Sequence, residues 1–368
     1  MHQSAARRST GSPLVSGLLV GLSMLIAGCG GDTTSSAPST SFAYVTTPSG
    51  DPAAPEAAPC AEPVDDPDVA SSLLDDADPG DVVCITGEGF ADVDLSISRS
   101  GALGDPIRLI GVDGVVVRSV SVDADDVNVE SLSVARGEGI VASGTRLTIN
   151  ANTVTDARLD GISCEPCAGA LILGNTIERA DGTGIRVSGN QIVIHGNTVT
   201  GSVRIEANDA DGIRFFGSNH RITANTVADI KDDGYEDEPP HTDCFQTFDN
   251  GGKPGTTDTV IEGNTCRNVD HQCLIATAEE AGLNGALGRS ARLRFVDNVC
   301  EVEGSQAVLI GWFPDVEVRG NRLTGPGLER AVYLGDSSIN AWVADNDVQP
   351  GVPEVEADDS SQPGLRTT

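Results

Sequence analysis

Two aspartates and one arginine occupy matching places in successive segments of this 368-residue sequence. Asp211 and Asp243 each stand two residues before an apolar residue of the inward-facing type, and Arg214 follows that apolar position in the first segment. Carboxylates on adjacent strands repel each other unless a cation, a proton or an arginine offsets their charge. The three residues are the leading catalytic candidates, and the aspartates are also a candidate calcium site. The plainer interpretation of each aspartate alone is turn chemistry, because Asp is common in turns.

Histidines and hydrogen-bonding side chains accompany this set. His241 and His271 are candidate general bases, because an imidazole exchanges a proton near neutral pH. His271 alone is also consistent with a residue of a turn or of the rim of a loop. The predicted substrate-binding residues are Gln246, Arg186, Lys253 and Gln272.

A short repeat must position these residues. It reads apolar, two residues, Asn, one residue, apolar, and it occurs eight times between Ile149 and Val348. Successive asparagines are 23, 22, 28, 39, 34, 23 and 25 residues apart. Between copies lies a small residue followed by an apolar one, as in Gly184-Ile185. Short strands separated by turns, with alternate side chains facing inward, are typical of a stacked parallel β-helix.

The repeat region resembles a known superfamily. Residues 79–81 (Pro-Gly-Asp) and 104–107 (Gly-Asp-Pro-Ile) resemble the opening coil of pectate-lyase-like β-helices. With the Asn repeat, the resemblance covers roughly residues 60–350. It implies an all-β fold, a single right-handed parallel β-helix, with a capping helix predicted at residues 68–74. It is specific for the fold and not for an activity, because this superfamily contains lyases, hydrolases, esterases, epimerases and non-enzymes.

A second, shorter resemblance concerns the candidate site. Residues 241–246 (His-Thr-Asp-Cys-Phe-Gln) are similar to a His-x-Asp-x-x-Gln strand of β-helix proteins thought to act on glycans. This resemblance implies that His241, Asp243 and Gln246 line a site.

Insertions in the repeat predict where a groove is built. Extra residues precede or follow three consecutive strands, predicted at 211–216, 243–248 and 272–277, and include the segments 231–241 and 279–290. Insertions in a solenoid map to loops that often border the binding face. The earlier and later coils are tight and are predicted to be scaffold.

Two enzymatic functions and one non-enzymatic function fit these residues. In a polysaccharide lyase acting on a uronate glycan, calcium on Asp211 and Asp243 neutralises the sugar carboxylate, and Arg214, Lys253 or His241 takes the proton. In a glycoside hydrolase the two aspartates act as paired carboxylates. A glycan-binding or structural surface protein needs neither reaction. The lyase is slightly preferred, and a polysaccharide is the expected partner in each functional case.

Eight cysteines follow Cys29, and an even number in an exported chain predicts disulfides. The repeat places the last four cysteines in two inward slots on successive coils, where the alternatives are stacked disulfides and free buried thiols. The predicted pairs are Cys60–Cys84, Cys164–Cys167, Cys244–Cys273 and Cys266–Cys300.

Both ends of the chain are predicted to lie outside the fold. Residues 1–29 carry two arginines, an apolar run and small residues before Cys29, which resembles a bacterial lipoprotein signal. Residues 30–59 are predicted to be a flexible linker and residues 351–368 a disordered tail. The protein is therefore expected to be exported and to contact the membrane only through a lipid on Cys29. Its formal net charge of −32 argues against nucleic acid as a partner, and a monomer is expected.

Overall fold

The computed structural model describes residues 52, 60–207, 209–236, 238–248, 252–278 and 290–368. The predicted signal segment with Cys29, almost all of the predicted linker and most of the 279–290 insertion lie outside the described residues. Within the described part of the chain, no helix is long and hydrophobic enough to cross a lipid bilayer.

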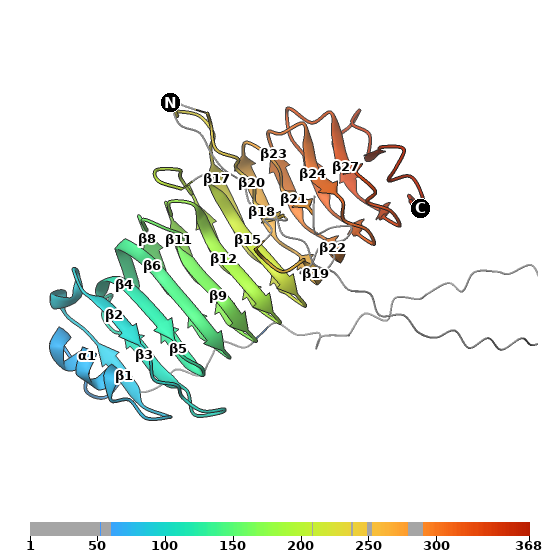
Figure 1. Cartoon of the computed structure of the whole chain (residues 1–368). Helices are drawn as coiled ribbons and strands as arrows, with labels where there is room; N and C mark the ends of the chain where they lie inside the picture. The colour runs from blue at the N-terminus through green and yellow to red at the C-terminus, as the bar shows by residue number, and fades with distance from the viewer. Residues whose placement is uncertain (1–51, 53–59, 208, 237, 249–251, 279–289) are drawn as a thin grey trace, which may run out of the picture. The chain divides into compact units, whose positions relative to one another are not determined.

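The described domain is a parallel β-solenoid of about 11 turns, which confirms the predicted all-β class (Figure 1). Its strands form three columns, in which each strand pairs in parallel with the equivalent strands of the coils before and after it. The first column contains β1 (Val82–Ile85), β3 (Ile107–Gly111), β5 (Val127–Glu130), β7 (Thr148–Asn150), β10 (Leu171–Leu173), β13 (Val193–His195), β16 (Arg221–Thr223), β19 (Thr257–Glu262), β22 (Ala291–Val296), β25 (Glu317–Arg319) and β28 (Trp342–Ala344).

Two long strands, β4 (Val116–Asp123) and β6 (Ser133–Thr145), run through both of the other columns. The second column continues with β8 (Thr153–Thr155), β11 (Thr176–Glu178), β14 (Thr198–Thr200), β17 (Thr226–Ile230), β20 (Thr265–Val269), β23 (Val299–Val302), β26 (Arg322–Thr324) and β29 (Asp347–Val348). The third contains β2 (Asp94–Ile97), β9 (Ile162–Ala168), β12 (Thr183–Asn190), β15 (Asp211–Ser218), β18 (Phe245–Thr247), β21 (Leu274–Thr277), β24 (Gln306–Gly311), β27 (Arg330–Gly335) and β30 (Val355–Ala357).

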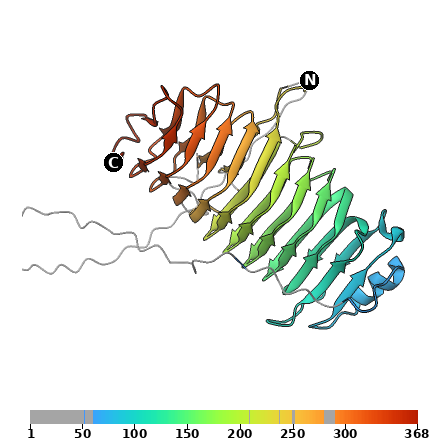
Figure 2. The same ribbon diagram turned by 180° about the vertical axis from the view of Figure 1, so that it is seen from behind.

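The predicted capping helix is present as α1 (Pro67–Asp75), followed by the short 3₁₀ helix η1 (Glu88–Phe90). The Asp66 carboxylate caps α1 by accepting hydrogen bonds from the first free N–H groups of the helix. Ala70 and Leu74 are buried, and α1 packs against β1 and β2 at the start of the stack (Figure 2). The helix therefore covers the edge that the first coil would otherwise expose.

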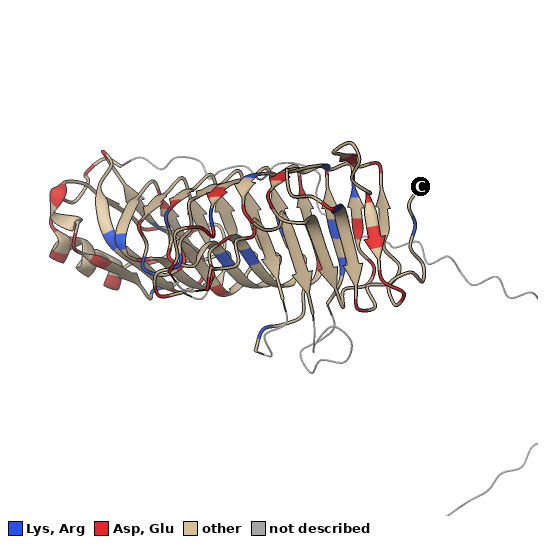
Figure 3. Ribbon diagram, turned by 90° about the horizontal axis from the view of Figure 1, so that it is seen from above, with Lys and Arg blue, Asp and Glu red and all other residues tan. Residues whose placement is uncertain are grey.

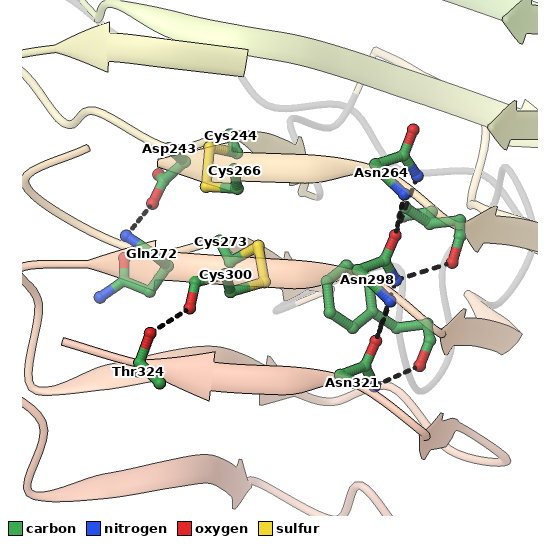
Figure 4. Close-up of a disulfide and its surroundings, with 12 residues drawn as sticks. Asp243, Cys244, Asn264, Cys266, Gln272, Cys273, Asn298, Cys300, Asn321 and Thr324 are labelled. Atoms are coloured by element: carbon green, nitrogen blue, oxygen red, sulfur yellow. Dashed lines mark hydrogen bonds between the residues drawn. A yellow bond between two sulfur atoms is a disulfide. The ribbon is translucent and has the colours of Figure 1, made fainter. Parts of the chain in front are cut away.

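The repeated asparagines form a buried ladder along the stack. Asn175 Oδ1 accepts hydrogen bonds from both the backbone N–H and the Nδ2–H of Asn152, and its own Nδ2 donates to the Ile149 carbonyl. The pattern continues through every later coil (Figure 4 shows three rungs) and ends on the Glu354 carboxylate, which accepts from Asn346. Each rung satisfies its amide, so the ladder holds neighbouring coils in one register.

The small residue that precedes an apolar residue in each repeat, as in Gly184-Ile185, is required by the lack of space inside the coil. Gly184 leads into the inward-facing Ile185, and a Cβ at Gly184 would lie 2.2 Å from Val199 Cγ1 on the next face of the same coil. Because the interior of a coil is narrow, glycine at this corner lets β12 and β14 approach each other.

Four disulfides are present among the described residues, and two of the predicted pairs are correct: Cys60–Cys84 and Cys164–Cys167. The other two predicted pairs are wrong. The four remaining cysteines pair within a coil and not between coils (Figure 4). The observed bonds are Cys244–Cys266 and Cys273–Cys300, with Cα–Cα distances of 6.0 and 5.9 Å.

Side-chain direction explains this correction. Cys266 and Cys300 are directly opposite each other in the parallel register of β20 and β23, so their side chains point the same way, side by side. Cys244 and Cys266 instead come from different columns of one coil, and their side chains face each other across the interior. A disulfide forms more easily between sulfurs that face each other.

The prediction of a disordered tail after residue 351 is also wrong. β30 pairs in parallel with β27, and Arg366 forms a bridge with Trp342 at the last coil. The Arg366 guanidinium lies 4.9 Å from the centre of the Trp342 ring, and Ser361 is fully buried. This segment therefore covers the C-terminal end of the stack.

Replacing a ladder residue should destabilise the whole domain. In Asn225→Ala, the Asn197 N–H and Nδ2–H lose their acceptor, and the Ile194 carbonyl loses its donor. Each orphaned buried group costs about 1–3 kcal/mol, so we expect the free energy of unfolding to fall by at least about 3 kcal/mol. Denaturant unfolding measures this, with the exposed Asn190→Ala as the matched control. Equal stability of the two variants would show that the ladder contributes nothing.

The disulfide pattern is open to direct mapping. Proteolysis of the non-reduced protein followed by mass spectrometry should yield linked peptides for Cys244–Cys266 and for Cys273–Cys300. Recovery of a Cys266–Cys300 peptide as the main product would contradict the arrangement described above.

Candidate functional site

A groove crosses the outer face of the third column. Its floor is a column of outward-facing residues in direct register on β18, β21, β24 and β27, namely Gln246, Ile275, Leu309 and Tyr333. The groove has a volume of about 420 Å³. Its walls also include Asp209 and His241, which precede the strands, and Phe248, Trp312 and Asp336, which follow them.

The groove has a polar end and an apolar end. Asp209, His241 and Gln246 border it at the coils of β15 and β18, while Leu309, Trp312 and Tyr333 line it at the coils of β24 and β27. The three latter side chains are half-buried, so each keeps one face open to a ligand.

The two predicted catalytic aspartates are buried beneath the polar end. Asp211 and Asp243 have no exposed surface and are not among the groove-lining residues. Asp211 Oδ1 accepts a hydrogen bond from the Asp243 backbone N–H (3.1 Å), and its Oδ2 pairs with the Arg214 guanidinium. Asp243 accepts from the Gln272 backbone N–H (3.0 Å) and from Gln246 Nε2–H (3.3 Å). Neither carboxylate touches the groove, so a role in contact with substrate, as predicted, does not match their positions.

Burial changes the ionisation of both carboxyl groups. Removal from water raises the pKa of Asp211 to about 6, although the Arg214 charge acts in the opposite direction. Burial and the neighbouring Asp211 charge raise the pKa of Asp243 well above its ordinary value. The pair receives hydrogen bonds from backbone N–H groups, Arg214 and Gln246.

The predicted calcium site does not fit this arrangement. Calcium takes six to eight oxygen ligands. Asp211 and Asp243 each use both carboxylate oxygens in the hydrogen bonds above, and the described residues contain no cluster of three or more Asp, Glu, His or Cys side chains suited to a metal ion.

The predicted cationic residues near the site are all paired. Arg214 contacts Asp211 and also Asp209 (3.2 Å), and its guanidinium lies 5.3 Å from the centre of the Phe248 ring. Arg186 lies outside the groove and pairs with Asp160 and Glu165, two carboxylates of the preceding coil, and Lys253 contacts Glu165 at 2.6 Å. Each of these three cationic side chains therefore already forms an ion pair with a carboxylate of the protein.

The two predicted histidines lie close together but differ in exposure. His241 is exposed on the wall of the groove, and its ring centre is 5.4 Å from that of His271. His271 lies behind it, where Nδ1 accepts from the Thr242 N–H (3.4 Å) and Nε2 is 3.3 Å from an Asp232 carboxylate oxygen. His241 can contact a ligand, whereas His271 supports the wall behind it.

Sequence reasoning missed the apolar end. Gln272, which was predicted to bind substrate, is not on the groove. The apolar end is instead lined by Leu309, Trp312 and Tyr333, which belong to tight coils that were predicted to be scaffold. A signal for the apolar end was present: Leu309 and Tyr333 occupy the same outward slot of the repeat as Gln246 and Ile275. Following that slot to the end of the repeat would have found Leu309 and Tyr333, but not Trp312, which follows β24.

Charges of both signs are distributed along the whole stack (Figure 3). Several form rungs between successive coils, such as Asp126 with Arg146 and Asp258 with Arg292. In the first pair Asp126 is buried beneath the half-exposed Arg146, whereas both partners of the second pair are half-exposed. Such pairs are a regular feature of the turns and do not mark a site.

The buried aspartates predict an unusual dependence of stability on pH. Because the folded-state pKa values are raised, the unfolded chain binds fewer protons than the folded protein within the shifted window, and stability falls as pH rises. For Asp211 this window runs from 3.8 to about 6. The corresponding loss is about 3 kcal/mol, since one pKa unit is about 1.4 kcal/mol. Denaturant unfolding across this range measures the loss.

Substitutions at Asp243 test the cause. Asp243→Asn removes one buried charge and should give a flatter profile with a higher free energy of unfolding at neutral pH. Asp243→Ala leaves the Gln272 N–H without its acceptor and should be less stable than the wild type. The exposed Asp113→Asn is the charge-matched control. The explanation fails if Asp243→Asn and Asp113→Asn change the profile equally.

Comparisons with known proteins agree with this architecture. A family model described as "Right handed beta helix region" matches residues 113–348. A search of curated proteins finds no match. Among solved structures, a mutant tailspike protein of E. coli bacteriophage HK620 in complex with pentasaccharide superposes with a TM-score of 0.55 at 10% identity, covering 81% of this chain and 63% of that chain. This chain therefore spans less than two thirds of the tailspike chain.

Two polysaccharide lyases are also among the structural neighbours. Alginate lyase from Paenibacillus sp. str. FPU-7 has a TM-score of 0.43 at 17% identity, covering 82% of this chain and 92% of that chain. Pectate lyase Pel9A has a TM-score of 0.39 at 12% identity, covering 78% and 72%. The predicted right-handed β-helix fold is confirmed by the family match. The Asn ladder, the three columns of parallel strands and the family match lead to one conclusion: this chain belongs to the right-handed parallel β-helix family.

Proposed function

We propose that this chain is a carbohydrate-active protein that binds a glycan laid across successive coils in the groove. The observation that carries the proposal is the register of the floor, in which Ile275, Leu309 and Tyr333 form a continuous apolar surface beside Gln246. Binding sites for small molecules are mainly apolar with a few polar groups that orient the ligand. A sugar chain presents both kinds of surface, with C–H faces for stacking and hydroxyls for hydrogen bonds.

Aromatic side chains at the apolar end support this function. Tyr333 and Trp312 are rigid and amphipathic, so they provide contact area at a low entropic cost. The tailspike neighbour, whose structure holds a pentasaccharide, supports a glycan ligand for this fold. The four disulfides suit an oxidising compartment, which supports export and the lipid anchor that we propose at Cys29.

Cleavage of the bound glycan is a second candidate function, favoured by the ionisable groups at the polar end. His241 and Asp209 both border the groove there and could act as base and acid. Asp209 and Asp336, the two carboxylates among the described groove residues, are separated by four strand spacings, at least about 19 Å, which is too far for a glycosidase pair. Elimination from a uronate, the reaction slightly preferred from sequence, needs a cation for the sugar carboxylate, and Arg214, Arg186 and Lys253 are engaged with carboxylates.

Aromatic substitutions test glycan binding. Against a panel of neutral and uronate polysaccharides, Tyr333→Ala and Trp312→Ala should each weaken binding by about tenfold, because each removes about 1–2 kcal/mol of stacking contact. Isothermal titration calorimetry on folded protein measures the affinity. Leu103→Ala, at an exposed apolar residue away from the groove, is the control. Failure of the wild type to bind any glycan of the panel would exclude the proposed function.

Product analysis on the same panel separates the reaction classes. New reducing ends without an unsaturated sugar indicate hydrolysis, and new ultraviolet absorbance indicates elimination. Binding with neither product indicates a non-catalytic glycan-binding protein. If cleavage occurs, it should be lost in His241→Asn while affinity is retained.

A further inference from the structure

The Asp336 carboxylate, at the apolar end of the groove, has no ion-pair or hydrogen-bond partner among the described residues. Asp336 is exposed and lines the groove, and only its backbone N–H is engaged, by the Asp358 carboxylate. The other carboxylate among the described groove residues, Asp209, is instead paired with Arg214. A ligand that brings a positive charge to Asp336 therefore gains an interaction that the described protein does not itself supply.

A glycine opens the space beside Asp336. Thr277, Gly311 and Gly335 are directly opposite one another in the register of β21, β24 and β27. A Cβ added at Gly311 would lie 3.7 Å from Asp336 Oδ2 and 3.7 Å from Thr277 Cγ2, which are ordinary van der Waals distances, and Gly311 does not have a positive φ. The fold would therefore accept a side chain at this position. Glycine instead leaves a hollow at the bottom of the groove, and the Asp336 carboxylate borders it.

Two aromatic rings border the same end of the groove. Trp312 directly follows Gly311, and the Tyr333 ring lies over Gly335, where an added Cβ would come within 3.0 Å of Tyr333 Cε1. Both aromatic side chains are half-buried and line the groove. The face of an aromatic ring attracts an ammonium group held within about 6 Å of the ring centre. A free carboxylate and two aromatic rings around one hollow are a combination suited to an ammonium ion.

We propose that Asp336, Trp312 and Tyr333 form a subsite for a protonated amine, and that the groove takes a glycan whose amino sugars carry free amines. The ammonium group pairs with the Asp336 carboxylate and contacts the aromatic rings, while the neighbouring sugar units lie on the apolar floor. An N-acetylated sugar carries no charge at this position and does not form the ion pair. The inference rests on the proposed glycan-binding function and names the class of glycan.

The surrounding charges support a cationic ligand, because no Lys or Arg is among the described residues that line the groove. Arg330 lies outside the groove lining, 5.2 Å from the centre of the Tyr333 ring. Its charge is offset by the Glu329 and Glu356 carboxylates, at 3.6 and 3.3 Å. His241, which becomes cationic when protonated, borders the opposite end, three strand spacings or at least about 14 Å away. The formal net charge of −32 also attracts a polycation from a distance.

Oligosaccharides that differ only in acetylation test the subsite. The probes are glucosamine and galactosamine oligosaccharides, each paired with its N-acetylated counterpart of equal length, and a lysine peptide of equal charge. Affinities are measured by calorimetry at about pH 5.5, where the sugar amines are largely protonated and an exposed Asp carboxyl is ionised. We expect the wild type to bind the free-amine member of a pair at least about tenfold more tightly than the acetylated member. This preference should decrease as the salt concentration rises.

Asp336→Asn removes the charge and keeps the shape of the side chain. The affinity for the free-amine chain should fall by about tenfold, to that for the acetylated chain, whose own affinity should stay unchanged. The matched control is Asp113→Asn, because Asp113 is exposed, lies off the groove and has a φ of 55°, against 54° at Asp336. Gly311→Val fills the hollow and should weaken the binding of both chains by more than about tenfold.

The outcomes separate this inference from the function on which it rests. Equal affinities of the wild type for the two members of a pair, or an unchanged preference in Asp336→Asn, overturn the amine subsite and leave glycan binding intact. Unchanged affinities in Gly311→Val overturn it as well. Absence of binding for every oligosaccharide, or tighter binding of the lysine peptide than of any oligosaccharide, overturns both. Circular dichroism checks that each variant is folded, and Asp336→Asn decides the result if Gly311→Val is not.

Discussion

A buried column of asparagine amides holds the coils of this protein in one register, and the remaining structure depends on it. No coil of a β-solenoid closes a core alone, so each must stack on its neighbours at a defined alignment. A slip of one residue would turn inward side chains outward and leave buried amides unpaired. From Asn152 to Asn346, each amide oxygen is tied to the preceding coil, and Glu354 closes the ladder where the repeat ends. The ladder therefore also determines which outward side chains become neighbours.

The groove is a direct consequence of that register. Gln246, Ile275, Leu309 and Tyr333 are separated by 29, 34 and 24 residues in the sequence, yet they form one column, because insertions between strands leave the strand alignment unchanged. Long insertions are tolerated because they lie outside the stack, where the entropy of loop closure grows only slowly with length. The inward face is thus constrained by packing, while the outward face is available for recognition.

The two buried aspartates show how a solenoid can stabilise an unfavourable pair. Two carboxylates without exposed surface are costly, and the increase in the pKa of each measures that cost. Parallel strand pairing supplies backbone N–H groups from the following coil to each of them, and Arg214 and Gln246 supply the rest. The pair lies beneath the polar end of the groove, and Asp243 accepts a hydrogen bond from Gln246, which lines that end.

Sequence by itself determined the solenoid, its strand register and the capping helix, because the spacing of Asn and of inward apolar residues is a one-dimensional signal. Two of the residues that it singled out, Gln246 and His241, lie on the groove. The tertiary structure decided the features that depend on where side chains point and on how deeply they are buried. The pairing of the four inward cysteines follows from which side chains face each other across a coil, and the same sequence slots allow either pairing. Whether Asp211 and Asp243 meet solvent, and whether Arg214 is already engaged, depends on the layers that cover them. Trp312 and Tyr333 became part of the site only through stacking, because a groove across several coils is a property of their alignment and not of any single repeat.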